Sequence, residues 1–181
     1  MLAAALCLLG LCSAGGDAAG KVFLTVEEAL ELAFPGCKVE RGTEYLSVAE
    51  ERRAEELARG ELDGRVVRPY IATRDGKVVG TAYFDAHRVR TKNEVLMLVV
   101  DPDARLRRVE VLAFAEPPEY LPRATFYAQY AGKRLDELDP KRGIRGVAGA
   151  TLSAEAATAA SRRALAVHRV LAERGGVPQP R

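Results

Sequence analysis

Residues 146–153 have the sequence GVAGATLS and precede a long alanine-rich stretch with helical spacing. Gly146 and Gly149 permit backbone conformations and close approaches that a Cβ atom would prevent. The free N–H groups at the start of the following helix would face an anion, and the helix dipole would favour its charge. Thr151 adds a hydroxyl group at the same place. The segment therefore predicts an anion-binding turn; the alternative is a glycine turn whose threonine only caps the helix.

A second group of polar side chains follows the end of a predicted strand. His87, Arg90 and Thr91 lie where loops commonly carry functional residues, and a cap or a surface ion pair is the alternative. Glu116 and Glu119 flank a Pro-Pro pair, and we expect them to shape a pocket instead of transferring protons.

Residues 145–153 resemble the attachment motif of the FMN-binding domain family. The family includes the periplasmic flavoprotein subunits of sodium-pumping NADH:quinone reductases and of Rnf-type electron-transport complexes. In its motif, Asp-Gly-x-Ser/Thr-Gly-Ala-Thr, a flavin transferase esterifies the final threonine to the FMN phosphate. The positions that match or continue the motif are Gly146, Gly149, Ala150, Thr151, Leu152 and Ser153.

The chain also resembles stand-alone, exported FMN-binding proteins of bacteria. The resemblance spans about residues 24–171. Its other matching stretches are 75–83, 84–87, 90–91, 112–120, 143–144 and 162–163. It implies FMN as the cofactor, attached to Thr151. The other cofactor-binding residues that we expect are Gly149, Ala150, Gly146, Ser153, Arg145, His87, Arg90, Thr91, Tyr120 and Tyr127. The resemblance implies no catalytic residue and no metal ligand.

Two positions depart from the family motif. Arg145 stands where the motif has aspartate, and Ala148 replaces the usual serine or threonine. Because the aspartate resembles part of what the transferase recognises, covalent attachment is less firmly predicted than FMN binding. Arg145 either pairs with the phosphate or is a surface charge.

A flavin also needs apolar or aromatic walls for its ring. The candidates are Tyr120, Phe126, Tyr127 and Tyr130, with burial in the core as the alternative. His168 follows the apolar spacing of the last helix, which predicts a histidine at the edge of the core.

An antiparallel sheet is predicted upstream of this turn. Residues 65–73 and 77–85 are rich in β-branched and aromatic residues and flank Asp75-Gly76, a strong hairpin signal. Residues 94–100 and 105–115 flank a second turn at 101–104. Four strands joined in this way indicate an antiparallel sheet.

Helices are predicted on both sides of these strands. Thr25 and Glu28 form a capping-box pattern before a short amphipathic helix that ends near Phe34. Residues 44–59 also have a helical pattern, and 125–132 form a short helix or an aromatic-lined loop. The last helix runs from about Ser153 to Arg174. The chain is therefore predicted to be a single α+β domain with four or more strands packed against helices. The inward positions that we expect in the 44–59 helix are Leu46, Ala49, Ala54, Leu57 and Ala58.

The first 16 residues contain no charged side chain and have an apolar run of signal-peptide length. We interpret residues 1–19 as a signal peptide or N-terminal anchor, with lipidation of Cys12 as another possibility, and residues 20–181 as the FMN-binding domain. Removal of the leader would leave Cys37 as the single thiol, so no disulfide framework is predicted. With two histidines in the chain, a histidine-based zinc or haem site is not expected.

The charge balance of 27 basic and 25 acidic residues argues against nucleic-acid binding through a large basic surface. We therefore predict an exported, periplasmic or membrane-associated electron-transfer protein that carries FMN. Its partners would be membrane or periplasmic electron-transfer proteins and the flavin transferase. Two alternatives remain: a small flavin reductase with a diffusible substrate, and a flavin-free assembly or binding module.

Overall fold

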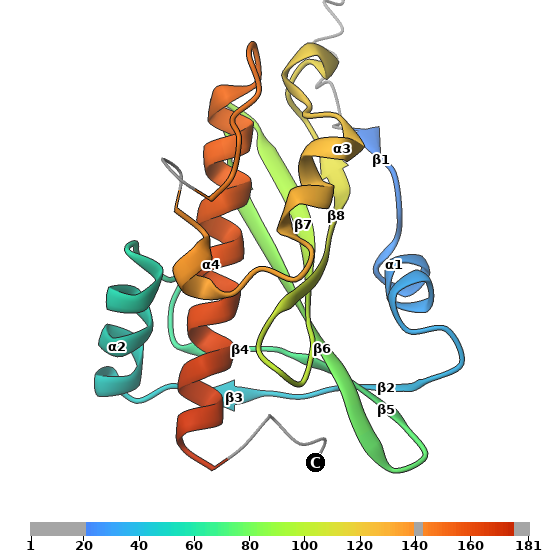
Figure 1. Cartoon of the computed structure of the whole chain (residues 1–181), viewed down its shortest axis with the longest axis vertical. Helices are drawn as coiled ribbons and strands as arrows, with labels where there is room; N and C mark the ends of the chain where they lie inside the picture. Colours follow the sequence, from blue (N-terminus) through green and yellow to red (C-terminus); the bar gives the residue numbers. More distant parts are fainter. Residues whose placement is uncertain (1–20, 140–142, 176–181) are drawn as a thin grey trace, which may run out of the picture.

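The computed structural model describes residues 21–139 and 143–175, which form a single α+β domain (Figure 1). Six antiparallel strands pair in the order β1-β8-β7-β6-β5-β2, so the predicted antiparallel sheet is confirmed. These strands are β1 (Lys21–Val22), β2 (Lys38–Arg41), β5 (Tyr70–Arg74), β6 (Lys77–Arg88), β7 (Asn93–Val100) and β8 (Leu106–Phe114). A separate pair consists of β3 (Glu44–Tyr45) and β4 (Val66–Val67).

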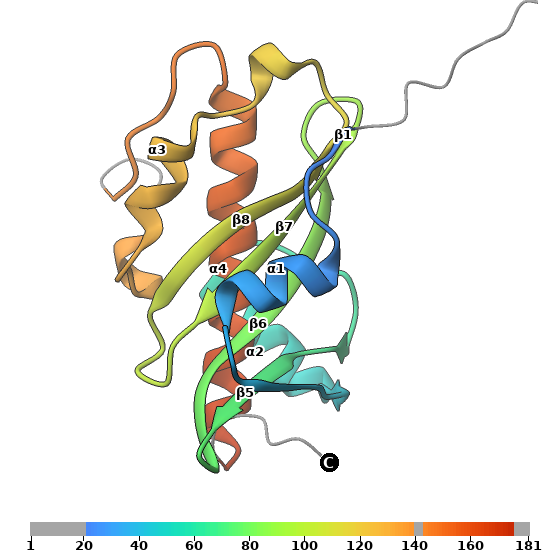
Figure 2. The ribbon, with the colours of Figure 1, turned by 90° about the vertical axis from the view of Figure 1, so that its right-hand side faces the viewer.

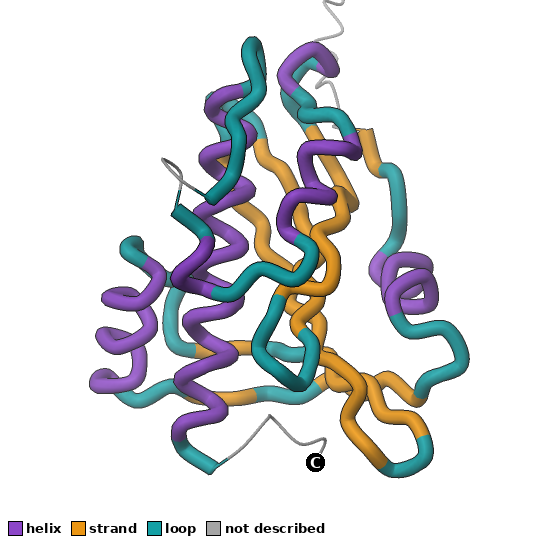
Figure 3. Tube along the Cα trace, in the orientation of Figure 1, coloured by secondary structure: helices purple, strands orange, loops and turns teal. Residues whose placement is uncertain are grey.

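Helices cover both faces of the six-stranded sheet, as Figure 2 shows for α1 and α4. Their bounds are α1 (Val26–Ala33), α2 (Val48–Ala58), α3 (Ala124–Tyr127) and α4 (Thr151–Glu173), with 3-10 turns η1 (Pro118–Tyr120), η2 (Ala128–Tyr130) and η3 (Leu135–Glu137). Figure 3 distinguishes these helices from the strands and shows the long α4 beside the sheet.

Strand β7 explains why the sheet needs cover on both sides. Its Leu96 and Leu98 belong to the apolar cluster that contains α4, whereas Met97 and Val99 belong to the cluster that contains α1. Successive side chains of a strand point to opposite faces, so an uninterrupted apolar strand must be buried on both.

Local signals account for several element boundaries. Asp75 and Gly76 both have positive φ, of 52° and 74°, as the two-residue turn between β5 and β6 requires. Thr25 and Glu28 form the predicted capping box of α1. Because these interactions lie within a few residues, they were visible in the sequence.

The predicted helix over 44–59 is wrong at its start. Helix α2 begins at Val48, because Ser47 caps it and Glu50 completes a capping box. Of the expected inward positions in this segment, Ala49 is exposed, whereas Leu46 is buried although it precedes the helix.

The predicted leader and its cleavage site lie outside the described residues. In the described part of the chain, no helix is both long enough and apolar enough to cross a membrane.

Candidate functional site

The glycine turn leads directly into an uncapped helix. Gly149 has a φ of +83°, a conformation that favours glycine. Ala150 is the N-cap residue of α4 and makes no side-chain capping bond. Thr151 is therefore the first residue of the helix, so the alternative that it only caps the helix is wrong. Its side chain is exposed. Within residues 21–139 and 143–175 no side chain caps α4, so the N–H groups of its first turn are open to solvent or an anion.

The hydroxyl groups of Ser153 and Thr151 differ in their accessibility, although both residues lie in the first turn of α4. The Ser153 hydroxyl donates a 2.6 Å hydrogen bond to the backbone carbonyl of Tyr120 and is buried. This bond joins the first turn of α4 to η1. The hydroxyl of Thr151 is consequently the accessible one in this turn.

Arg90 reaches the same place from the loop between β6 and β7. Its guanidinium carbon lies 4.5 Å from the centroid of the Tyr120 ring. The backbone N–H groups of Arg90, Thr91 and Lys92 donate to one oxygen of Glu116, at 3.1, 2.5 and 2.7 Å. The bonds from Lys92 and Thr91 hold the pKa of the Glu116 carboxyl below its ordinary value. Glu116 thus fixes the loop that carries Arg90.

These segments enclose two adjoining pockets. The smaller has a volume of about 160 Å³ and is lined by Arg90, Tyr120 and the five residues 149–153. The larger, of about 710 Å³, shares Arg90 and Tyr120 with the smaller. Most of its other walls are apolar and include Phe23, Phe114, Pro117, Pro118 and Leu121. The polar residues that line it besides Arg90 and Tyr120 are Lys21, Thr91, Lys92 and Glu116.

Arg145 and Gly146 belong to the same loop but do not line either pocket. Both are exposed. The side chain of Gln129 holds the peptide backbone here: its Oε1 accepts from the Arg145 N–H at 3.0 Å, and its Nε2 donates to the Arg145 carbonyl at 3.2 Å.

His87 and Tyr127 lie in a different set of contacts, joined through Glu94. His87 Nδ1 lies 2.8 Å from an Asp85 oxygen, and its Nε2 lies 3.1 Å from Glu94 Oε2. The Tyr127 hydroxyl donates to the other Glu94 oxygen at 3.0 Å, and Arg163 donates two bonds to Asp85. These contacts form a continuous polar chain on the sheet face that α4 covers. Its members are Arg163, Asp85, His87, Glu94 and Tyr127.

The charges of this polar chain support one another. Burial disfavours the imidazolium form of His87, but hydrogen bonds to Asp85 and Glu94 and their negative charges outweigh it, raising the pKa to about 9. Burial likewise opposes ionisation of Asp85, yet bonds from His87 and Arg163 lower its pKa to about 2. His87 is therefore a cation at neutral pH.

The other candidate aromatic residues are part of the core. Phe126 and Tyr130 are buried, and the Tyr130 hydroxyl lies 2.7 Å from Thr158 Oγ1. His168 is also buried, with its Nδ1 3.0 Å from the Tyr83 hydroxyl. Of the aromatic candidates for a ring wall, Tyr120 is the one that lines the two adjoining pockets.

The sequence reasoning did not identify Asp85, Glu94 or Arg163 as members of this chain. A signal for two of them was present: Asp85 and His87 lie two residues apart on one strand face, and the hairpin register pairs His87 with Glu94. Arg163 and its neighbour Arg162 belong to a stretch that the family resemblance includes, but no spacing in the sequence placed them near Asp85. Arg162 is buried and donates to four backbone carbonyls, namely those of Leu57, Ala58, Leu135 and Leu138.

No protein-family model matches the chain, and the searches of curated proteins and of solved structures likewise gave no match.

Proposed function

We propose that the protein is an exported electron carrier that binds FMN and holds it through a phosphoester bond to Thr151. One observation supports this most strongly. Arg90, Tyr120 and residues 149–153, which are far apart in the sequence and which the family resemblance singles out, line one small pocket.

The chemistry of the smaller pocket suits a phosphate group. The uncapped first turn of α4 offers backbone N–H donors, and Arg90 supplies a guanidinium. At about 160 Å³ the pocket is below the usual range of about 300–1,000 Å³ for whole ligands, so it suits the phosphate and not the ring.

The larger pocket suits the flavin ring. Its volume of about 710 Å³ lies within the range of ligand sites, and Phe23, Phe114 and Tyr120 would provide aromatic walls. When bound, FMN supplies one- or two-electron transfer. Lys21 and Lys92 would add positive charge beside the ring, and the Glu116 carboxylate adds one negative charge, while the apolar walls exclude water.

Thr151 is the residue best suited to attachment in this turn. Its side chain is exposed to an incoming transferase, whereas the hydroxyl of Ser153 is buried and bonded to Tyr120. The transferase would join Thr151 Oγ1 to the FMN phosphorus by breaking the phosphoanhydride bond of a flavin dinucleotide donor. The nucleoside monophosphate leaves, and the threonine hydroxyl proton is released, so the product gains the mass of FMN less one water. A tether suits a protein outside the cytoplasm, where lost FMN could not readily be replaced.

Co-expression with a flavin transferase tests the proposal. We expect the intact mass to increase by FMN minus water, and Thr151→Ala to abolish the increase. Ser153→Ala is the matched control and should keep the adduct. An adduct that persists in Thr151→Ala, or that maps to Ser153, contradicts the assignment.

Two further results would favour the alternatives. NADH oxidation by the purified protein without partners would indicate a flavin reductase, and protein without any flavin absorbance would indicate a flavin-free module.

For export, we expect the mature chain outside the cytoplasm to begin between residues 15 and 20. An intact Met1 on cytoplasmic protein would contradict export.

A further inference from the structure

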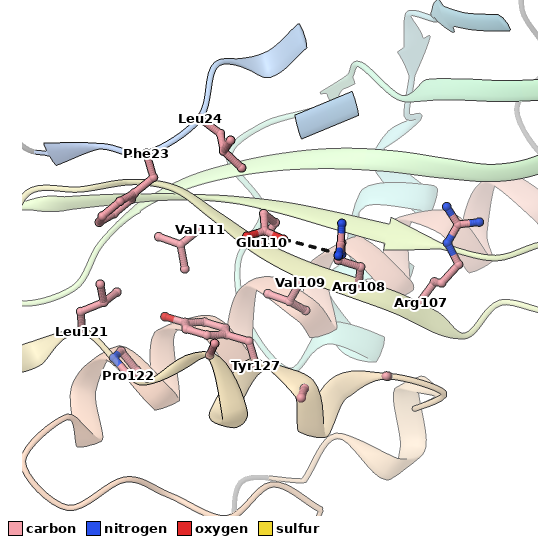
Figure 4. Close-up of a pocket in the computed structure, with 13 residues that line it drawn as sticks. Phe23, Leu24, Arg107, Arg108, Val109, Glu110, Val111, Leu121, Pro122 and Tyr127 are labelled. Carbon is pink, nitrogen blue, oxygen red and sulfur yellow. Dashed lines mark ion pairs between the residues drawn. The ribbon is translucent and has the colours of Figure 1, made fainter. Parts of the chain in front are cut away.

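A groove runs along the outer edge of β8, apart from the turn that leads into α4. We call it the β8 groove; it has a volume of about 530 Å³ and contains residues 107–111 of β8. Figure 4 shows Phe23 and Leu24 on one side of it and Leu121, Pro122 and Tyr127 on the other.

The backbone of β8 is incompletely paired along this groove. Strand β7 pairs with one edge of β8 over its whole length. On the other edge, β1 pairs only with Ala113 and Phe114, and the N–H groups of Phe23 and Leu24 donate to the carbonyl of Leu112.

The opposite end of this outer edge is also occupied. The Leu106 N–H donates to the Lys133 carbonyl, and the Leu106 carbonyl accepts from Gly132. In the described part of the chain, no strand pairs with the outer edge between these ends, at residues 107–111. An open strand edge is a template for another strand. Five residues correspond to about 17 Å at about 3.4 Å per residue.

The walls of the groove would hold apolar side chains next to that edge. Val109 and Val111 share one face of the strand, beside Tyr127. The Tyr127 ring is held in place by the bond from its hydroxyl to Glu94. Phe23 is 38% exposed and lines the groove, so its ring is available to a ligand.

The charges at one end of the groove favour an acidic ligand. Arg108 pairs with Glu110, with 3.6 Å between the charged groups. Arg107 donates to the Ala33 carbonyl and lies over the Phe34 ring at 4.9 Å. Among residues 21–139 and 143–175 no carboxylate forms an ion pair with Arg107, so this end carries a net positive charge.

We propose that the β8 groove binds a short, extended segment of a partner protein by strand addition to residues 107–111. The segment alternates apolar side chains, which contact Val109, Val111 and Tyr127, and places an acidic side chain beside Arg107. A second copy of this chain suits the groove less well, because its own β8 edge is flanked in the same way by β1 and by residues 132–133. The proposal does not depend on FMN binding.

If both proposals hold, the partner segment would lie beside the flavin pocket. Phe23 and Leu121 line both the β8 groove and the larger pocket. A docked partner would therefore be close to the proposed ring site.

A random heptapeptide library displayed on phage, selected against the full chain, tests the proposal. We expect enrichment of sequences with alternating β-branched or aromatic residues and at least one aspartate or glutamate. The best synthetic peptide should lose at least tenfold in affinity with Arg107→Glu and with Ala128→Glu, an exposed position on the wall of the groove. Arg52→Glu, the same charge change on exposed α2, is the matched control and should leave affinity unchanged.

Changes to the peptide test strand addition without altering the protein. N-methylation of alternate peptide residues should abolish binding in one register and leave it in the other, because one edge of a strand faces β8. Hydrogen exchange should slow within residues 107–111 when the peptide binds.

Three results would overturn the proposal. The first is selection without any peptide whose binding depends on Arg107. The second is equal tolerance of both N-methylation registers. The third is a concentration-dependent dimer in light scattering that Ala128→Glu abolishes, since a second copy would then occupy the groove.

Discussion

The two histidines have opposite environments, and this predicts a maximum in stability near pH 6.5. Burial lowers the pKa of His87, but Asp85 and Glu94 outweigh burial and raise this pKa to about 9. Its stabilising contribution is therefore complete below the unfolded value of about 6.5 and is lost as the pH rises through 9. Burial lowers the pKa of His168 to about 4. Its neutral form stabilises the fold above pH 6.5, and that contribution is lost as the pH falls towards 4.

The magnitude follows from these pKa values. A shift of one pH unit in a pKa corresponds to about 1.4 kcal/mol. The pKa of each histidine differs by about 2.5 from 6.5, so each contributes about 3 kcal/mol to the free energy of unfolding in its stabilising protonation state. Asp85, with a pKa lowered to about 2, adds a further loss below pH 4. Since the chain has only two histidines, each slope can be assigned by substitution.

Urea unfolding followed by circular dichroism between pH 5 and 9.5 measures the effect. In His87→Gln, the fall in the free energy of unfolding between pH 6.5 and 9 should be reduced by about 3 kcal/mol. At pH 6 this variant should be destabilised by about 3–5 kcal/mol, because it leaves the buried carboxylate of Glu94 without its cation. His168→Gln is the matched control and should keep the alkaline slope while losing the acid one.

An unchanged alkaline slope in His87→Gln would refute the reasoning. It would mean that the Asp85–His87–Glu94 chain does not hold a charged imidazolium. The same conclusion would follow if His168→Gln, and not His87→Gln, removed the alkaline slope.

Three further predictions concern the turn before α4 and Arg90, which lines the same pocket. Gly149→Ala should destabilise the fold by about 1 kcal/mol in thermal unfolding and weaken FMN binding, because φ is +83° there; Gly146→Ala, where φ is not positive, is the control and should change little. Arg90→Ala should weaken non-covalent FMN binding roughly 10- to 100-fold in a fluorescence titration, from the loss of a charge-assisted contact of about 1.5–3 kcal/mol; unchanged affinity would place the phosphate elsewhere. Arg145→Asp combined with Ala148→Ser should raise the flavin-labelled fraction in intact-mass analysis without strengthening non-covalent binding. Complete labelling of the wild type would show that the aspartate of the motif is dispensable here.

Much of the fold could be predicted because its signals are local. The Asp75-Gly76 turn needs two positive φ angles, and the capping box of Thr25 and Glu28 spans only three residues. The apolar run of β7 reflects burial on both faces. The helix predicted from residue 44 began too early because periodicity outweighed the local cap at Ser47.

The candidate site was only partly visible in the sequence, since its residues come from three separate segments. The sequence by itself determined that a glycine turn leads into a long helix with Thr151 near its start, because backbone freedom and helical spacing are local properties. Only the tertiary structure decided that Arg90 and Tyr120 join that turn, that the Ser153 hydroxyl is bonded to Tyr120, and that His87 contacts Glu94. Those contacts depend on how α4 packs against the sheet and on the strand register. A hydrogen bond of about 3 Å is gained or lost with shifts far smaller than a residue pattern can specify.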